Sequence, residues 1–534
     1  MAVKTTRPVA MATGGMVASP HYFASLAGLR VLQEGGSAVD AAIAVNSTLG
    51  IVYPHMTGMG GDAFWLIYDA KQNKVHALNG SGPAVSGATR AHYRKLGLNN
   101  IPQRGPHAAL TVPGAVDAWC KAHERFGKLS MAQCLQPAIH YARNGYPVSA
   151  GQVQFTRGTA QILGRYADTR DAFMPGGRAP ELGEIMRFPG MADTMEAIAK
   201  NGRAGFYEGP VAEEIVRALT AAGGDWQTSD LSGFHSEWGE PISTDYRGYK
   251  CYQHPPNSQG FAHLMTLNIL ENFDVAALRT DRAAYIHLLV EATKLAFMDR
   301  DRYLTDPRHN DIPLDRLLAK AYAKELAARI DFDQAMAHEP NPMGQDTTCT
   351  VVVDGEGNAA SIIQSLYHEF GSCFVAGKTG ILLQNRGSFF SLDDDHINRL
   401  EPGKRSFHTL MPGMLFRDGK LDLVYGTMGG EGQPQTSTAV VTRYVDFNHD
   451  VQTAVDNPRW LYGRTWGDAT RALRLENRFD EEVFASLRAR GHEVQITEAW
   501  CDFMGHAAAI KVDQRTGVLF GAADARGEGI AVGW

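Results

Sequence analysis

The residues best suited to chemistry lie where a polar loop meets a β-branched run, at positions 345–354. Thr347 precedes three consecutive valines, 351–353, which favour a strand because branched side chains suit a pleated surface. If the Asp346–Thr347 bond were broken, the new α-amino group would lie beside the Thr347 hydroxyl. Its ordinary pKa of roughly 7.7–8.0 would let it act as a general base near neutrality. Two interpretations follow: a nucleophilic threonine that begins a second chain, or an ordinary strand with surface threonines.

The elements around this stretch fit the first interpretation. Residues 354–358 predict a hairpin turn into a second strand at 359–363. Residues 332–346 contain two prolines and a glycine without periodicity, which indicates the flexible approach that a self-cleaving bond needs. Further strands are expected downstream, one of them at 380–383. Residues 151–248 are more polar and turn-rich, and predict a lobe or lid on the core.

Composition excludes several classes of function. The 534 residues are 44% hydrophobic and carry a net charge of −7, which argues against a nucleic-acid or anionic-membrane partner. No apolar stretch is long enough for a membrane span, and no apolar segment follows the basic N-terminal residues, so we expect a cytoplasmic protein. Six scattered cysteines predict free thiols: Cys120, Cys134, Cys251, Cys349, Cys373 and Cys501.

Two further patterns each allow two interpretations. The glycine-rich segment 58–61 could hold a phosphate, but no lysine follows at P-loop spacing, and close backbone packing near an active site is favoured. His287 and Glu291 stand four residues apart on a predicted helix and could bind a metal ion. With no third ligand in view, a hydrogen-bonded pair or salt bridge is favoured. We expect neither a metal nor an organic cofactor in the reaction.

Taken together, these segments resemble the γ-glutamyltranspeptidase family of N-terminal-nucleophile hydrolases. The resemblance covers nearly the whole chain, and its motifs occur in a fixed order. They are residues 15–18, 35–42, 54–55, 58–61, 112–114, 347–348, 370–371, 380–383 and 429–430.

The resemblance implies an α/β fold, a four-layer αββα sandwich with an additional helical or loop lobe. It implies a precursor that cleaves itself before Thr347 into a large chain, 1–346, and a small chain, 347–534, which stay associated; a higher oligomer stays open. Thr347 Oγ would attack an amide carbonyl and form an acyl-enzyme. Gly429 and Gly430 match the oxyanion-hole glycines, and Ser365 matches a hydroxyl residue that supports the nucleophile.

The substrate pocket departs from the family pattern. Residues 78–83 contain no arginine where the family binds the α-carboxylate of a glutamyl group, and Phe389 stands where an acidic residue would bind its amino group. His408 and Thr409 replace a serine pair, and Tyr367 replaces an asparagine. A zwitterionic glutamyl group would lose both charged anchors, so we expect the site to reject it.

The remaining polar residues suit a smaller substrate. Arg386 can bind a carboxylate through two hydrogen bonds, with His408 and Tyr367 near the nucleophile. Segments around Tyr367, His408 and Gly429 look like the branch of the family that includes oxamate amidohydrolase. We therefore expect hydrolysis of a small carboxylate-bearing amide such as oxamate. Structural roles are the alternative: Arg386 paired with an acidic neighbour such as Asp393, and His408 bonded to backbone.

Two other functions stay open. One is a glutathione hydrolase or γ-glutamyltransferase whose anchors come from other segments, for example Arg104 or Arg90. The other is an unprocessed, non-catalytic binding protein, which predicts a single intact polypeptide.

Overall fold

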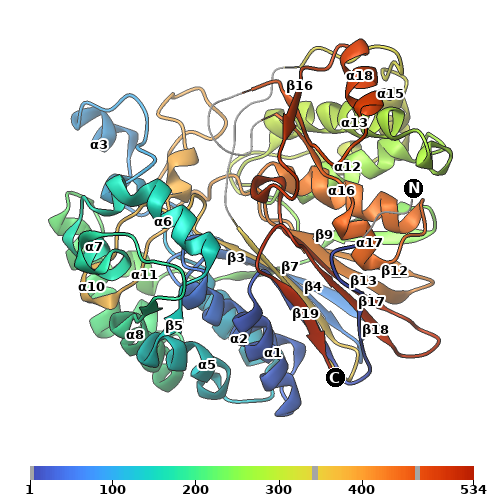
Figure 1. Cartoon of the computed structure of the whole chain (residues 1–534). Helices are drawn as coiled ribbons and strands as arrows, with labels where there is room; N and C mark the ends of the chain where they lie inside the picture. The colour runs from blue at the N-terminus through green and yellow to red at the C-terminus, as the bar shows by residue number, and fades with distance from the viewer. Residues whose placement is uncertain (1–4, 339–346, 464–469) are drawn as a thin grey trace.

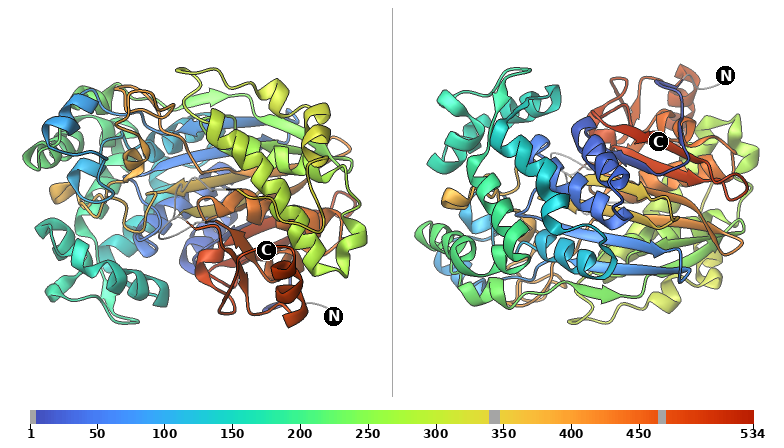
Figure 2. Two further views of the ribbon diagram at one scale, coloured as in Figure 1. Left: turned by 90° about the horizontal axis from the view of Figure 1, so that it is seen from above. Right: turned by 90° about the horizontal axis from the view of Figure 1, so that it is seen from below.

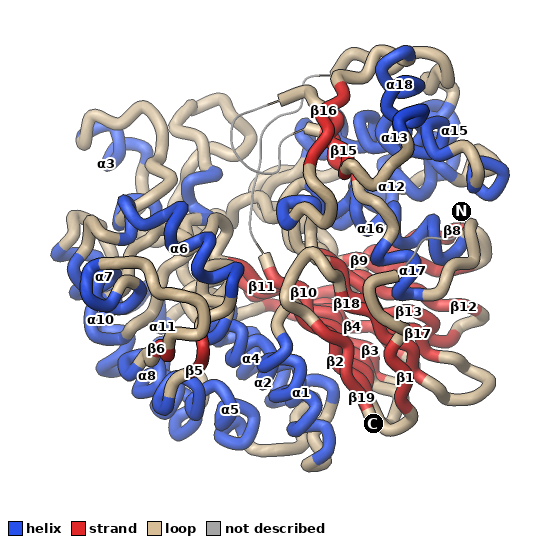
Figure 3. The backbone as a smooth tube through the Cα atoms, in the orientation of Figure 1, coloured by secondary structure: helices blue, strands red, loops and turns tan. Residues whose placement is uncertain are grey.

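Two seven-stranded sheets face each other at the centre of the molecule (Figures 1 and 3). The computed structural model describes residues 5–338, 347–463 and 470–534. In one sheet the strand order is β1 (Ala10–Ala12), β18 (Leu519–Ala523), β17 (Ala507–Val512), β13 (Lys420–Thr427), β12 (Gly413–Arg417), β9 (Tyr249–Gln253) and β8 (Ile242–Tyr246). In the other it is β19 (Ile530–Gly533), β2 (Met16–Ser19), β10 (Thr348–Val353), β11 (Ala359–Ser365), β3 (Asp62–Asp69), β4 (Lys74–Gly80) and β7 (Glu237–Gly239).

Alternation along the strands fills the space between the sheets. In β10, Val351 and Val353 point between the sheets, whereas Val352 packs on the helices outside. The β10–β11 hairpin was predicted at this position, and the structure confirms it with Val353 opposite Ala359. Every pairing within the two large sheets is antiparallel. Along each strand, successive side chains point alternately to the two faces of the sheet.

Helices cover both outer faces and complete the expected αββα sandwich (Figure 2). The face formed by β2, β10, β11 and β3 carries α1 (Tyr22–Gln33), α2 (Ala38–Val52), α4 (Ala115–Phe126) and α5 (Met131–Asn144). The other sheet carries α12 (Gly260–Leu270), α13 (Arg282–Tyr303), α16 (Gly432–Val445) and α17 (Val451–Asp456). Helix α2 is buried along its whole length, because it lies between the sheet and other helices.

The predicted lobe is helical, and it is shorter than expected. It contains α6 (Ala150–Leu163), α7 (Ala167–Phe173), α8 (Pro189–Asn201), α9 (Ala204–Tyr207), α10 (Gly209–Ala221) and α11 (Thr228–Ser232), which gather on one side of the sandwich (Figure 1). The last part of 151–248 belongs to the core instead, because β7 and β8 each join a large sheet.

Smaller elements complete the described chain. They are α3 (Arg90–Lys95), α14 (Leu314–Leu317), α15 (Lys320–Ala327) and α18 (Glu481–Ala489), a sheet of β14 (Trp460–Tyr462), β15 (Leu473–Glu476) and β16 (Val494–Thr497), and the pair β5 (Tyr146–Pro147) and β6 (Ile185–Met186). The strand expected at 380–383 is wrong: Gly380 has a φ of +70°, and the segment makes only isolated bridges, such as Gly60 with Leu383. No helix among the described residues has the length and apolar character needed to cross a membrane.

Candidate active site

Thr347 lies immediately before β10, near the middle of its sheet, and only 1% of its surface is exposed. Because Thr348 pairs with Gln364, the register places Thr347 beside Ser365, the last residue of β11. The Ser365 hydroxyl accepts a hydrogen bond from the Tyr367 N–H at 2.7 Å. The predicted cleavage partner Asp346 lies outside the described residues. Two of the predicted site residues, Thr347 and Ser365, therefore meet at the ends of adjacent strands.

The predicted oxyanion glycines form the turn between β13 and α16. Gly429 and Gly430 have φ values of +120° and +52°, a region that glycine adopts far more readily than other residues. Gln433, in the first turn of α16, donates from Nε2 to Thr347 Oγ at 3.5 Å. This contact brings the start of α16 next to the threonine hydroxyl. The diglycine turn and Thr347 thus belong to one site.

Gln259 joins two parts of this site. From the start of α12, its Nε2 donates to the carbonyl oxygens of Thr409 at 2.9 Å and Gly430 at 3.0 Å. Its Oε1 accepts from Arg300 Nη1 at 3.2 Å, and Arg300 is fully buried on α13. A fixed amide therefore connects the diglycine turn with the segment that holds His408 and Thr409.

Arg386 is a buried cation whose hydrogen-bonding capacity is largely unused. It begins a 3-10 helix, Arg386–Phe389, and is 1% exposed. Its Nη2 makes a long hydrogen bond of 3.4 Å to Thr409 Oγ, and its guanidinium carbon lies 4.0 Å from the centre of the Tyr367 ring. Within the described part of the chain, Nε and Nη1 have no hydrogen-bond partner. Burial lowers its pKa to about 10, so it stays charged at neutral pH.

His408 pairs with a carboxylate that the sequence analysis did not single out. His408 Nε2 lies 2.9 Å from Asp62 Oδ2, and both residues are buried. Asp62 Oδ1 accepts hydrogen bonds from the N–H groups of Gly82 and Gly114 at 3.1 Å and from Gln384 Nε2 at 2.9 Å. Burial raises the pKa of Asp62 from 3.8 to about 7, and it lowers the pKa of His408 well below its ordinary value.

The glycine-rich segment before Asp62 serves close backbone packing, as the sequence analysis favoured. A Cβ on Gly60 would lie 2.1 Å from the Leu382 carbonyl oxygen, and one on Gly61 would lie 2.1 Å from that of Ser365. The loop therefore fits tightly against the end of β11. It brings Asp62 into the site. The glycine-rich segment indicated a position near an active site, but it did not single out Asp62.

The other candidate arginines have different partners. Arg104 pairs with Glu369 and donates to the Gly371 carbonyl oxygen at 2.6 Å. Arg90 pairs with Asp394 at 2.6 Å and is partly exposed. Among the described residues, the ion pair suggested between Arg386 and Asp393 is not formed. Of these three arginines, Arg386 is therefore the one without an ion pair to a described residue.

His287 and Glu291 form hydrogen bonds, although with different partners from those expected. Glu291 pairs with Lys294 at 2.7 Å, whereas His287 Nδ1 lies 2.8 Å from His492 Nε2. His287 Nε2 bonds to the Asp331 carbonyl oxygen at 2.7 Å. His492 is a third ligand-type residue beside His287 and Glu291, which the sequence did not reveal. The Lys294 ammonium group already balances the charge of the Glu291 carboxylate.

Comparisons with known proteins show which family the chain belongs to. Residues 24–534 match the family described as gamma-glutamyltranspeptidase. The chain is 50% identical to a glutathione hydrolase-like YwrD proenzyme of Bacillus subtilis, with 98% of each chain covered, and 40% identical to an oxamate amidohydrolase proenzyme of Klebsiella pneumoniae, covering 98% of this chain and 99% of that one. The crystal structure of a cephalosporin acylase from Bacillus halodurans superposes with a TM-score of 0.93 at 37% identity, covering 100% of this chain and 98% of that one. The chain belongs to the gamma-glutamyltranspeptidase family and is an N-terminal-nucleophile amide hydrolase.

Proposed function

We propose that this protein is an autoprocessed threonine hydrolase that cleaves a small carboxylate-bearing amide, with oxamate as the reference substrate. The observation that carries the proposal is Arg386: a buried, charged guanidinium with two nitrogens, Nε and Nη1, unpartnered in the described chain, and linked through Thr409 and Gln259 to the diglycine turn. A substrate carboxylate could accept a hydrogen bond from either nitrogen and would neutralise the charge. The name of the Klebsiella relative supports the same substrate class.

Maturation would break the Asp346–Thr347 bond and free the Thr347 α-amino group. The two products would stay together, because β10 and β11 from the small chain lie between β2 and β3 from the large chain. The relatives named proenzymes support such processing. No additional interface is needed to keep the mature enzyme assembled.

In the reaction, the Thr347 amino group would take the proton from Oγ as Oγ attacks the amide carbonyl carbon. Backbone N–H groups of Gly429 and Gly430 would donate to the oxyanion, and Gln433 would orient the hydroxyl. The C–N bond then breaks, and the amino group returns the proton to the departing ammonia. Water attacks the acyl ester in the same way and restores Thr347.

The first test is intact mass after incubation at neutral pH, alongside Thr347→Ala. We expect chains of about 38 and 20 kDa from the 58.2 kDa precursor, with Thr347 leading the smaller one, and no cleavage in the variant. Ammonia release from oxamate should then appear only in the processed enzyme. A stable intact chain without turnover would support the non-catalytic binding protein instead.

A second candidate function is glutathione hydrolysis, because the Bacillus subtilis relative at 50% identity is named glutathione hydrolase-like. The same processed enzyme would serve both candidates. The discriminating assay compares kcat/KM for oxamate with that for γ-glutamyl-p-nitroanilide. Equal or greater activity on the γ-glutamyl substrate would overturn the small-amide proposal without affecting the nucleophile assignment.

A further inference from the structure

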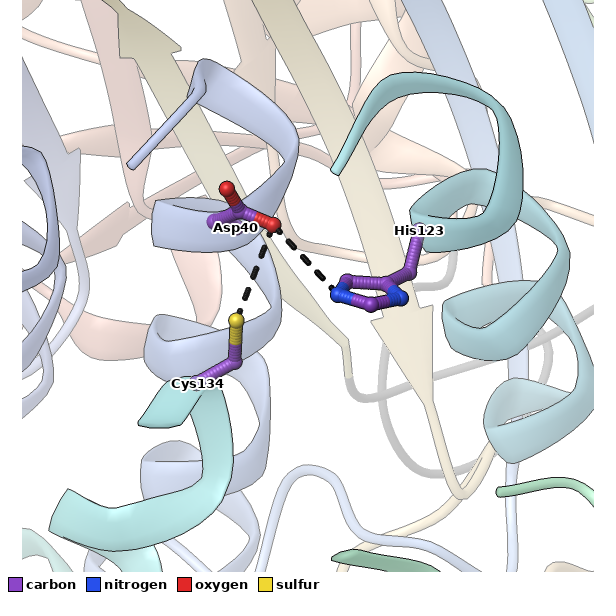
Figure 4. Close-up of side chains that lie close together, drawn as sticks. All are labelled: Asp40, His123 and Cys134. Carbon is purple, nitrogen blue, oxygen red and sulfur yellow. Dashed lines mark hydrogen bonds and ion pairs between the residues drawn. The ribbon is translucent and has the colours of Figure 1, made fainter. Parts of the chain in front are cut away.

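Three ligand-type side chains meet outside the active site, between α2, α4 and α5 (Figure 4). They are Asp40 in the first turn of α2, His123 on α4 and Cys134 on α5, and their ligand atoms all lie within 4.8 Å of one another. Asp40 Oδ1 is 3.8 Å from His123 Nε2 and 3.6 Å from Cys134 Sγ. We propose that these three residues bind a divalent metal ion of the zinc type.

The environment of Asp40 favours a cation. The side chain is fully buried, and its Oδ2 accepts hydrogen bonds from three backbone N–H groups, those of Ser37 at 2.9 Å, Lys128 at 2.8 Å and Leu129 at 3.1 Å. These bonds fix the carboxylate and leave Oδ1 facing the other two side chains. In the residues that the structure describes, no lysine or arginine forms an ion pair with Asp40. A buried carboxylate without a full countercharge is unfavourable, and a metal ion would supply that charge.

The donor set matches zinc in both chemistry and charge. A thiolate, a neutral imidazole and a carboxylate carry two negative charges, which balance Zn²⁺. A tetrahedral ion with ordinary bond lengths would separate Asp40 Oδ1 from Sγ by about 3.5 Å and from Nε2 by about 3.3 Å. The distance from Oδ1 to the thiol already matches this geometry, and the distance from Oδ1 to His123 Nε2 has to shorten by about 0.5 Å.

Metal binding would break one hydrogen bond of His123 and remove one proton from Cys134. His123 Nε2 now lies 2.7 Å from the Leu129 carbonyl oxygen, so the imidazole must release this bond and carry its proton on Nδ1. The Cys134 thiol loses its proton to solvent. A water molecule would fill the fourth position, and the His123 side chain, 22% exposed, gives the ion a route inward.

A second cluster of ligand-type residues differs because its carboxylate already has a positively charged partner. In the group of His287, Glu291 and His492, the carboxylate already pairs with Lys294, and the Met336 N–H occupies its second oxygen. A metal ion there would have to displace an ammonium group. The Asp40 group needs no such displacement, and it is therefore the site we propose.

The position of the site predicts a structural role. The Ala38 N–H, at the start of α2, donates to Asp354 in the β10–β11 turn at 3.0 Å. That turn is at the far end of β10 from Thr347. An ion that links α2, α4 and α5 would fasten the helical layer to the sheet, and should raise stability while leaving hydrolysis unchanged.

The experiment uses the full-length protein after treatment with a chelator, titrated with Co²⁺ as a spectroscopic probe. We expect a near-ultraviolet cobalt–thiolate charge-transfer band that saturates at one equivalent and disappears when Zn²⁺ is added. Zn²⁺ should also raise the Tm. Absence of the band in the wild-type protein would overturn the proposal.

Variants locate the site. Cys134→Ser should remove the band and the Tm shift. His123→Asn changes a partly exposed position and should also lose the Tm shift, so it tests the site even if the buried cysteine variant fails to fold. Cys120→Ser on α4 is the matched control and should behave as wild type, because Cys120 is outside the group. A band or Tm shift that persists in Cys134→Ser would overturn the assignment.

Discussion

Replacing Arg386 by methionine should separate substrate recognition from folding. The change keeps an unbranched side chain of similar length and removes the charge. In the free enzyme, a long hydrogen bond of 3.4 Å, the Tyr367 ring and the attraction of the nearby Asp62 compensate for the burial of the guanidinium. Each hydrogen bond to a charged group contributes roughly 1.5–3 kcal/mol when the substrate carboxylate is bound.

Two such bonds at the lower limit give about 3 kcal/mol, which corresponds to a loss of about 100-fold in kcat/KM for oxamate. Removal of the charge should leave the free energy of unfolding unchanged or raise it. The reason is that the desolvation penalty of a poorly paired buried ion is several kcal/mol, whereas the contact with Tyr367 contributes about 0.5–2 kcal/mol. Arg386→Lys, which keeps the charge without the fork, should fall between methionine and wild type.

The assay measures kcat/KM for oxamate and for acetamide, which lacks the carboxylate, together with urea unfolding. Acetamide hydrolysis should change less than about threefold, since no interaction with Arg386 is lost. Arg94→Met, which removes an exposed arginine paired with Asp394, is the matched control and should leave both rates unchanged. Equal losses on both substrates, or a fall of more than about 2 kcal/mol in unfolding free energy, would show that Arg386 has a structural role.

Three further changes test the rest of the site. Gln259→Leu should lower kcat by about tenfold for oxamate and acetamide alike, because the Gly430 and Thr409 carbonyls lose their shared donor. Its control is Gln161→Leu, on an exposed face of α6. Gly430→Ala should lower kcat by on the order of 10²–10³, since a φ of +52° is strained for alanine and the turn would shift its N–H groups. Asp62→Asn should flatten the pH dependence of stability. The pKa of Asp62 is raised from 3.8 to about 7, so between those pH values the folded protein holds a proton that the unfolded chain has lost. In the wild-type protein, stability therefore falls by up to about 4 kcal/mol as pH rises across this range.

The outcomes that would contradict these three predictions differ. A Gln259→Leu enzyme impaired on oxamate alone would place Gln259 in carboxylate recognition. Normal turnover by Gly430→Ala, once intact mass has verified processing, would remove the diglycine turn from the oxyanion site. Parallel unfolding curves for Asp62→Asn and wild type between pH 5 and 8 would mean that Asp62 keeps an ordinary pKa.

Local patterns in the sequence were enough to predict the elements that carry the nucleophile. The valines of β10 and the turn after Asp354 specify their conformation through nearby residues, whereas the glycines at 429–430 were identified through the family resemblance. The strand expected at 380–383 failed because Gly380 takes a left-handed conformation and the segment bonds to loops on both sides. A run of aliphatic residues shows that a segment is buried, and it does not show which neighbours are available to pair.

Long-range pairing explains what the sequence could not reveal. His408 was identified because it departs from the family pattern, but Asp62, its partner, is 346 positions away. Gln259 likewise contacts residues 150 and 171 positions away. No local signal marks a buried amide or carboxylate as part of such a site, since its role depends on which strands the fold places side by side.

The arrangement of charges also explains why a glutamyl group should bind poorly. Its ammonium group would enter a site whose available cation is Arg386, and Phe389, at the expected acidic position, stacks on Phe407 at 4.8 Å. Asp62 is one buried acid of the described site, yet its Oδ1 already accepts three hydrogen bonds and its Oδ2 bonds to His408. Its raised pKa also means that only part of its population is ionised at neutral pH. On our proposal, the pocket therefore recognises one negative charge, and an ammonium group beside it would lack a partner.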